Sequence, residues 1–170
     1  IMIMGGSRIA IRISSYAPDN MAIKLIECDK QKSYKLAEYM NDIIIIQGDG
    51  RNVDLLKEEG IRDMDAFIAL TDSSETNILA CLTAKELGVK KTIAEVENIQ
   101  FISTAERLNI GNIINKKLLA ASRIFQLLLD EDSSNAKCLA LSDAEVVELV
   151  AKENSKITKA AVKDLKLPSD

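Results

Sequence analysis

Short apolar runs alternate with longer amphipathic segments along the first 131 residues of the chain. The apolar runs are nearly continuous and rich in isoleucine, which is typical of strands covered on both faces of a parallel sheet. They predict six strands, at 1–4, 22–27, 42–47, 65–70, 91–96 and 111–115. Helical periodicity predicts helices at about 8–17, 30–40, 52–59, 74–87, 98–108 and 117–131. Repeated β-α units of this kind predict an α/β fold with a doubly wound parallel sheet of the Rossmann type.

The pattern changes after Asp130. Residues 130–135 are polar and rich in serine, which predicts a linker. The remaining tail predicts a strand, a turn, a second strand and a short helix, and it is too short to bury a core of its own. We therefore expect a Rossmann-type nucleotide-binding domain over 1–131, and a linker followed by the truncated start of a small α+β C-terminal subdomain over 132–170.

Composition narrows the classes of function. The chain is 47% hydrophobic and 28% charged, as in soluble globular proteins, and no apolar run reaches the roughly 18 residues of a membrane-spanning helix. A net charge of −4 disfavours binding to nucleic acid. Cys28, Cys81 and Cys138 lie far apart, which indicates free thiols in a reducing compartment. The chain has no histidine, so we expect neither a catalytic constellation nor a metal site.

A glycine-rich turn follows the first predicted strand and precedes the first predicted helix. In IMIMGGSRIA, the glycine positions of the dinucleotide fingerprint G-x-G-x-x-G are occupied by Gly5, Ser7 and Ala10. Gly5 would make the tight turn, and Gly6 adds conformational freedom beside it. Backbone N–H groups at the helix start would hold a phosphate, and Arg8 offers a charge-assisted contact.

An acid at the end of the second predicted strand completes the fingerprint. Glu27 follows Gly5 by 22 residues, where a carboxylate hydrogen-bonds the adenosine ribose hydroxyls. An acid in this place disfavours the 2′-phosphate of NADP. The alternative interpretation is a simple turn, with Glu27 as a solvated strand end.

Two further loops follow predicted strands at the edge where parallel sheets bind ligands. Asp49 and Gly50, after the third strand, suit the adenine end of a nucleotide. Thr71 and Asp72, after the fourth strand, would face the far end of the ligand. The alternative for this second loop is helix capping, by Asp72 or Ser73.

Several stretches resemble one family of regulatory domains in potassium transport, the RCK or KTN (TrkA-N) domains. They are MIMGGSRIA, KLIECD, IIIIQGDG, the long run that begins LLKEEGIRDMDAFIALTDSSETN, and ITKAAVKDLKLPSD. The whole chain is similar to the second half of a duplicated bacterial Trk potassium-uptake regulatory subunit. The resemblance implies a cytoplasmic, non-enzymatic subunit, peripheral to the inner face of the membrane. Such a subunit binds NAD(H) or ATP/ADP and gates a membrane potassium transporter by conformational change.

The resemblance also implies where the ligand lies, with phosphates at the glycine turn, ribose after the second strand and adenine after the third. The implied contacts are Gly5, Gly6, Ser7, Arg8, Ile9, Glu27, Asp49, Gly50, Thr71 and Asp72. The chain departs from the family pattern in three regions. Ser7 replaces the usual middle glycine, Glu95 and Glu97 stand where many members have a basic residue, and Asn115-Lys116 replace a common Ser-Pro.

The last predicted helix carries a broad apolar stripe within 118–129. Its members are Leu118, Ala121, Ile124, Phe125 and Leu128. The resemblance implies that this helix is exchanged between partners, so we expect a homo-oligomer, at least a dimer, through 118–129. The alternative is a helix buried in its own domain.

Two other classes of function remain open from the sequence. A coenzyme-binding domain of an NAD-dependent dehydrogenase would need a substrate domain and a proton donor or acceptor beside the nicotinamide. An oligomerisation scaffold would leave the cleft empty.

Overall fold

The computed structural model describes residues 1–128, 133–138, 145–149, 151, 153, 155–159 and 161–164. The chain divides into two compact units, Ile1–Lys116 and Lys117–Asp170, which are described separately. The domain boundary expected at residue 131 stays a prediction.

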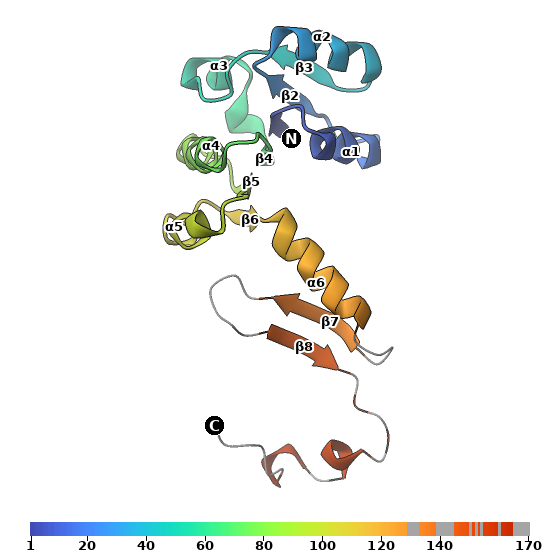
Figure 1. Cartoon of the computed structure of the whole chain (residues 1–170). Helices are drawn as coiled ribbons and strands as arrows, with labels where there is room; N and C mark the ends of the chain where they lie inside the picture. The colour runs from blue at the N-terminus through green and yellow to red at the C-terminus, as the bar shows by residue number, and fades with distance from the viewer. Residues whose placement is uncertain are drawn as a thin grey trace. The chain divides into compact units, whose positions relative to one another are not determined.

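The first unit is built on a six-stranded parallel sheet with the order β3-β2-β1-β4-β5-β6 (Figure 1). Its strands are β1 (Met2–Met4), β2 (Lys24–Glu27), β3 (Ile44–Gln47), β4 (Ala66–Ala69), β5 (Lys91–Glu95) and β6 (Asn112–Ile114). The predicted doubly wound α/β fold is confirmed. The strand order reverses where β1 pairs with both β2 and β4, and such a point opens a ligand crevice at the carboxyl ends of the strands.

Helices connect successive strands and cover both faces of the sheet, with α1 on one face and α4 and α5 on the other (Figure 1). They are α1 (Arg8–Tyr16), α2 (Lys30–Tyr39), α3 (Val53–Glu58), α4 (Ser74–Glu86) and α5 (Ile102–Arg107), with 3₁₀ turns η1 (Ile61–Asp63) and η2 (Ile99–Phe101). The single helix predicted at 98–108 is therefore a 3₁₀ turn followed by α5. Asn98 accepts a hydrogen bond from the backbone of Gln100, which tightens this first turn.

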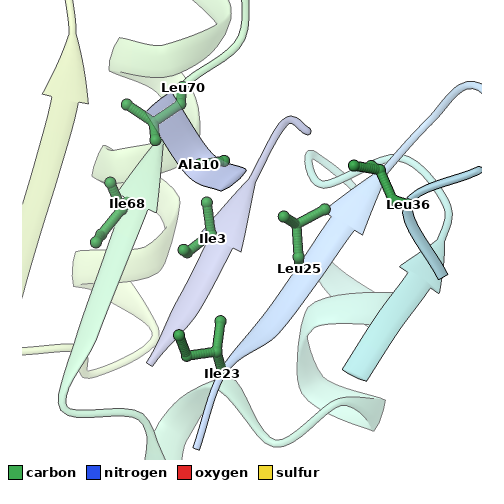
Figure 2. Packing of buried hydrophobic residues seen from close by; sticks show 7 residues of the cluster. All are labelled: Ile3, Ala10, Ile23, Leu25, Leu36, Ile68 and Leu70. Atoms are coloured by element: carbon green, nitrogen blue, oxygen red, sulfur yellow. The ribbon is translucent and has the colours of Figure 1, made fainter. Parts of the chain in front are cut away.

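One hydrophobic cluster lies between the sheet and the first two helices (Figure 2). Ile3 is in register with Leu25 on one side and with Ile68 on the other, so the three side chains share one face of the sheet. Ala10 of α1 and Leu36 of α2 pack onto this face, and Ala10 is fully buried. The third fingerprint position thus allows the close helix–strand packing that the motif requires.

The second unit contains most of α6 and a two-stranded antiparallel sheet. Its elements are α6 (Lys116–Leu128), β7 (Ser133–Cys138), β8 (Glu145–Leu149), η3 (Lys156–Thr158) and η4 (Val162–Asp164). β7 begins inside the predicted linker because pairing with β8 draws polar residues into a strand. The predicted short helix near the end is a pair of 3₁₀ turns, and residues 129–132 lie outside the described residues.

Candidate functional site

A cleft of about 960 Å³ lies at the carboxyl ends of the parallel strands, within the first unit. Its walls come from the loops after β1, β2, β3 and β4, from the end of β5 and from the start of α6. The predicted site residues that line it are Gly5, Ser7, Arg8, Ile9, Glu27, Asp49, Gly50, Thr71 and Asp72. Gly6, the remaining predicted residue, is buried and does not line the cleft.

The glycine turn after β1 is shaped by two close approaches of the backbone. Gly5 has φ +96°, and a Cβ there would meet the backbone of Leu70 and Thr71 at 3.0 Å. A Cβ on Gly6 would collide with the side chain of Leu36 and lie 3.0 Å from Glu27 Oε2. The position of Gly5 therefore requires glycine, whereas a side chain at Gly6 would require the Leu36 side chain to shift.

Ser7 begins α1 as its N-cap. Its Oγ accepts a hydrogen bond from the backbone nitrogen of Ala10 at 3.2 Å. The backbone amides of Arg8 and Ile9, in the first turn, have no acceptor within the helix, and both residues line the cleft. Together with the helix dipole, these amides make the start of α1 suited to a phosphate group.

Glu27 is buried at the end of β2 and faces the glycine turn. Its Oε2 accepts a hydrogen bond from the Gly6 nitrogen at 2.9 Å and lies 2.7 Å from the Lys32 ammonium. Its Oε1 accepts from the Asp29 nitrogen at 3.0 Å. Burial raises the pKa of Glu27, but these hydrogen bonds and the Lys32 charge outweigh it, so the pKa lies below the ordinary value. A carboxylate only 4% exposed is not a solvated strand end.

The sequence did not single out Lys32, although it lines the cleft beside Glu27. Asp29 caps α2 by accepting from the Lys32 backbone nitrogen, and this places Lys32 in the first turn of the helix. A lysine soon after the fingerprint acid, at the start of the next helix, is the signal that would have found it.

The loop after β3 contributes a second paired carboxylate. Asp49 Oδ2 lies 2.7 Å from the Arg51 guanidinium, and its Oδ1 accepts from the Arg51 backbone nitrogen at 2.9 Å. These hydrogen bonds lower the pKa of Asp49. Gly50 packs against the side chain of Met4, which leaves no room for a Cβ. Arg51 is thus a further cleft residue that the sequence did not single out.

A buried asparagine fixes the loop after β4. Asn77 is fully buried, and its Oδ1 accepts hydrogen bonds from Thr71 N at 3.0 Å and Thr71 Oγ1 at 2.7 Å. Its Nδ2 donates to the carbonyls of Thr71 and Glu95, which ties β4 to β5. Ser73 caps α4 by accepting from Thr76 N at 3.1 Å, so the capping interpretation holds for Ser73. Thr71 and Asp72 remain in the wall of the cleft.

Two of the three departures from the family pattern, Glu95 with Glu97 and Asn115-Lys116, come together in space. The Lys116 ammonium lies 2.6 Å from Glu95 Oε1 and 2.6 Å from Glu97 Oε1. These two carboxylates raise the pKa of Lys116. Asn115 donates to the carbonyls of Val96 and Glu97, which holds the exit of β6 against the exit of β5. Many family members have a basic residue after β5. In this chain the basic residue is Lys116 at the start of α6, which is ion-paired with Glu95 and Glu97.

The described residues contain no cluster of three or more histidine, cysteine, aspartate or glutamate side chains that could hold a metal ion. Over the same part of the chain, no helix combines the length and hydropathy that crossing a membrane requires. The cleft combines backbone amides at the start of α1, the buried carboxylate of Glu27 and two ion pairs, which is a chemistry suited to a nucleotide.

Comparison with known protein families identifies a domain. Residues 1–116 match the family model described as the TrkA-N domain. This range covers the whole parallel sheet and the cleft.

Comparison with curated proteins finds potassium uptake proteins. The chain is 33% identical over 171 residues to the Trk system potassium uptake protein TrkA of Vibrio alginolyticus, covering 99% of this chain and 37% of that protein. It is 31% identical over 150 residues to the Trk system potassium uptake protein trkA homolog 1 of Methanosarcina mazei, covering 88% of this chain and 37% of that protein. The chain therefore spans little more than a third of the length of these relatives.

Solved structures share the fold. The GsuK RCK domain superposes with a TM-score of 0.66 at 15% identity, covering 74% of this chain and 27% of that one. The GsuK channel bound to NAD superposes with a TM-score of 0.59 at 18% identity, covering 81% of this chain and 24% of that chain. GsuK bound to ADP superposes with a TM-score of 0.59 at 17% identity, covering 78% of this chain and 34% of that chain.

Proposed function

We propose, from the premise that the chain belongs to the TrkA-N domain family, that it is a nucleotide-sensing regulatory domain of a potassium uptake system. The relatives named above are Trk potassium uptake proteins, which supports a role in potassium transport. The role is regulatory rather than catalytic, because the cleft offers binding groups and no histidine is present to act as a general base.

The ligand is NAD(H), or ADP or ATP, held in the cleft at the carboxyl ends of the strands. The observation that carries this proposal is the pairing of the glycine turn with a buried acid on the neighbouring strand, through Gly6 and Glu27. A pyrophosphate at the start of α1 would place the adenosine ribose beside Glu27 and the adenine beside Asp49 and Gly50. The NAD and ADP complexes of GsuK, which shares the fold, support the same class of ligand.

The output is a conformational change passed to a membrane potassium transporter, with the domain at the cytoplasmic face of the membrane. Assembly through α6 would link copies of the chain, as expected from the apolar stripe. Among the described residues of α6 none is buried: Ile124 and Leu128 of the stripe are 60% and 77% exposed, and Leu118 and Phe125 are half-buried. Large apolar side chains along one exposed helix are typical of an association surface, and two-fold symmetry is the commonest arrangement of identical subunits.

Thermal unfolding with and without nucleotide tests the proposal. A ligand at 100 times its dissociation constant should stabilise the protein by about 2.7 kcal/mol. We expect a concentration-dependent rise in Tm with NADH, ADP or ATP, and no rise with adenosine, which lacks the phosphates that α1 would bind. An unchanged Tm with every nucleotide at millimolar concentration would instead support the scaffold with an empty cleft.

A further inference from the structure

A buried amide side chain near the start of α4 is bonded to the wall of the cleft. Asn77 is 0% exposed and does not line the cleft itself. Its side chain accepts two hydrogen bonds and donates two, at distances between 2.7 Å and 3.0 Å. A carboxamide has two N–H donors and two lone pairs on its oxygen, so every hydrogen-bonding position of this side chain is used. A fully satisfied polar group in a core fixes the arrangement of its partners.

Most of these hydrogen bonds go to one residue of the cleft wall, Thr71. The Asn77 side chain accepts from Thr71 N and Thr71 Oγ1 and donates to Thr71 O, so both backbone groups and the hydroxyl of Thr71 are held. The remaining bond goes to the carbonyl of Glu95 at the end of β5. Earlier in α4, Ser74 Oγ accepts from the backbone nitrogen of Glu97 at 3.0 Å. The start of α4 therefore holds the loop after β4 and the exit of β5 in one arrangement.

The glycine turn after β1 lies against the loop that Asn77 holds. A Cβ on Gly5 would be 3.0 Å from the backbone of Leu70 and Thr71, so the two backbones are in close contact. On the side of β2, the Gly5 nitrogen donates to the Ile26 carbonyl at 2.8 Å. The loop after β4 is thus one of two supports of the turn proposed to bind phosphate.

We propose, on the basis of the function proposed above, that Asn77 is a positioning residue for nucleotide binding. It holds Thr71, and through Thr71 the glycine turn, in the binding arrangement before a ligand arrives. A loop ordered in advance raises affinity, because binding does not then cost the conformational entropy of ordering that loop. A purely structural role would instead lower the stability of the protein and leave its affinity for nucleotide unchanged.

The Asn77→Asp variant separates these two roles. Aspartate keeps the size of the side chain and an oxygen for Thr71 N, but it loses the donors to Thr71 O and Glu95 O and places a carboxylate oxygen against a carbonyl. Thr92→Val is the matched control. Thr92 is 2% exposed and lies outside the cleft, and its Oγ1 donates to the Ile110 carbonyl near the amino end of β5. Both variants lose buried hydrogen bonds, so both should unfold at a lower Tm.

The dissociation constants of NADH and ADP are measured by isothermal titration calorimetry, at a temperature where circular dichroism shows each protein to be folded. Asn77→Asp should raise both constants about tenfold or more, the cost of ordering roughly one backbone residue. Thr92→Val should keep both within about twofold of the wild type, as for a distant site. An unchanged affinity in Asn77→Asp, or an equal loss in Thr92→Val, would overturn the positioning role and leave nucleotide binding in place. A wild-type protein that binds neither nucleotide would overturn the proposed function, and the positioning role with it.

Hydrogen exchange of the wild-type protein, followed by NMR, tests the same inference without any variant. The Thr71 amide donates to Asn77 Oδ1. If this bond orders the loop in advance, the Thr71 amide should exchange as slowly as the amides of β4 in the absence of nucleotide. Saturating NADH should then slow it no more than it slows the amides of β4. A Thr71 amide that exchanges rapidly until NADH is added would show that the ligand orders the loop, and would overturn the inference.

Discussion

The Oε2 atom of Glu27 accepts a hydrogen bond from the backbone nitrogen of Gly6 at 2.9 Å, and so joins the end of β2 to the glycine turn after β1. The same oxygen lies 2.7 Å from the Lys32 ammonium. The carboxylate therefore holds the turn proposed to bind phosphate and also faces the position proposed for the ribose. Replacing Glu27 should therefore alter both the stability of the glycine turn and the affinity for the nucleotide.

Replacing Glu27 with glutamine should weaken NADH binding. Hydrogen bonds to a charged acceptor contribute about 1.5–3 kcal/mol each when lost, which corresponds to a rise in Kd of roughly 10- to 150-fold. The measurement is a calorimetric titration, with Glu38→Gln, an exposed acid of α2, as the control of equal charge. An affinity unchanged in Glu27→Gln would show that the acid serves only the turn.

Acid should destabilise the wild-type protein more than the Glu27→Gln variant. Burial raises the pKa of Glu27, yet its hydrogen bonds with Lys32 and the backbone bring it below the ordinary 4.5. A carboxyl with a lowered folded-state pKa stabilises the fold fully above its unfolded-state pKa, and this contribution is lost as the pH falls through the folded-state pKa. Urea unfolding from about pH 5 to about pH 3 should show the free energy of unfolding falling more steeply in the wild type. Parallel curves for the two proteins would contradict this.

Ser7 should matter for stability as a helix cap rather than as a replaced glycine. Removing its hydroxyl in Ser7→Ala should reduce the free energy of unfolding by about 1 kcal/mol, because the cap to Ala10 is lost. Ser7→Gly should cost only a few tenths of a kcal/mol, since glycine leaves the first-turn amides open to water. Equal losses in the two variants, measured by urea unfolding, would argue against capping.

The stripe on α6 should hold two copies of the chain together. We expect the wild-type protein to sediment as a dimer at tens of micromolar, and the double substitution of Ile124 and Phe125 with aspartate to give a folded monomer. Arg123→Asp is the matched control, because it makes the same change in net charge on the opposite side of the helix. A wild-type protein that sediments as a monomer would rule out this interface.

The order of strands and helices could be predicted from the sequence because the central strands β1, β2 and β4 are buried along most of their length and leave nearly continuous apolar runs. The edge strand β3 has an equally apolar sequence, although Ile44 is 57% exposed. The residues at which the strands and helices begin and end could not be predicted in this way. β2 begins at Lys24 rather than at residue 22 because its ladder with β1 begins with the pair Met2 and Lys24. The 3₁₀ turn before α5 depends on the Asn98 side chain, which periodicity does not report. Local partners, more than propensity, decide such boundaries.

Site residues could be predicted where a motif fixes their spacing along the chain. They could not be predicted where tertiary packing brings together residues that are distant in the sequence. Gly5 and Glu27 follow from the fingerprint. The pairing of Lys116 with Glu95 joins the start of α6 to the end of β5, and the bonds of Asn77 to Thr71 and Glu95 join two strands through a helix. The residues that flank these side chains in the sequence form no motif from which such contacts could be predicted.

The most direct test of the central claim is a crystal structure of this protein soaked with NADH. Nucleotide binding at the glycine turn predicts electron density for the pyrophosphate against residues 5–9, with the ribose hydroxyls within hydrogen-bond distance of Glu27. Density for NADH elsewhere on the molecule, or an empty turn at a concentration of NADH that saturates binding in solution, would contradict the account.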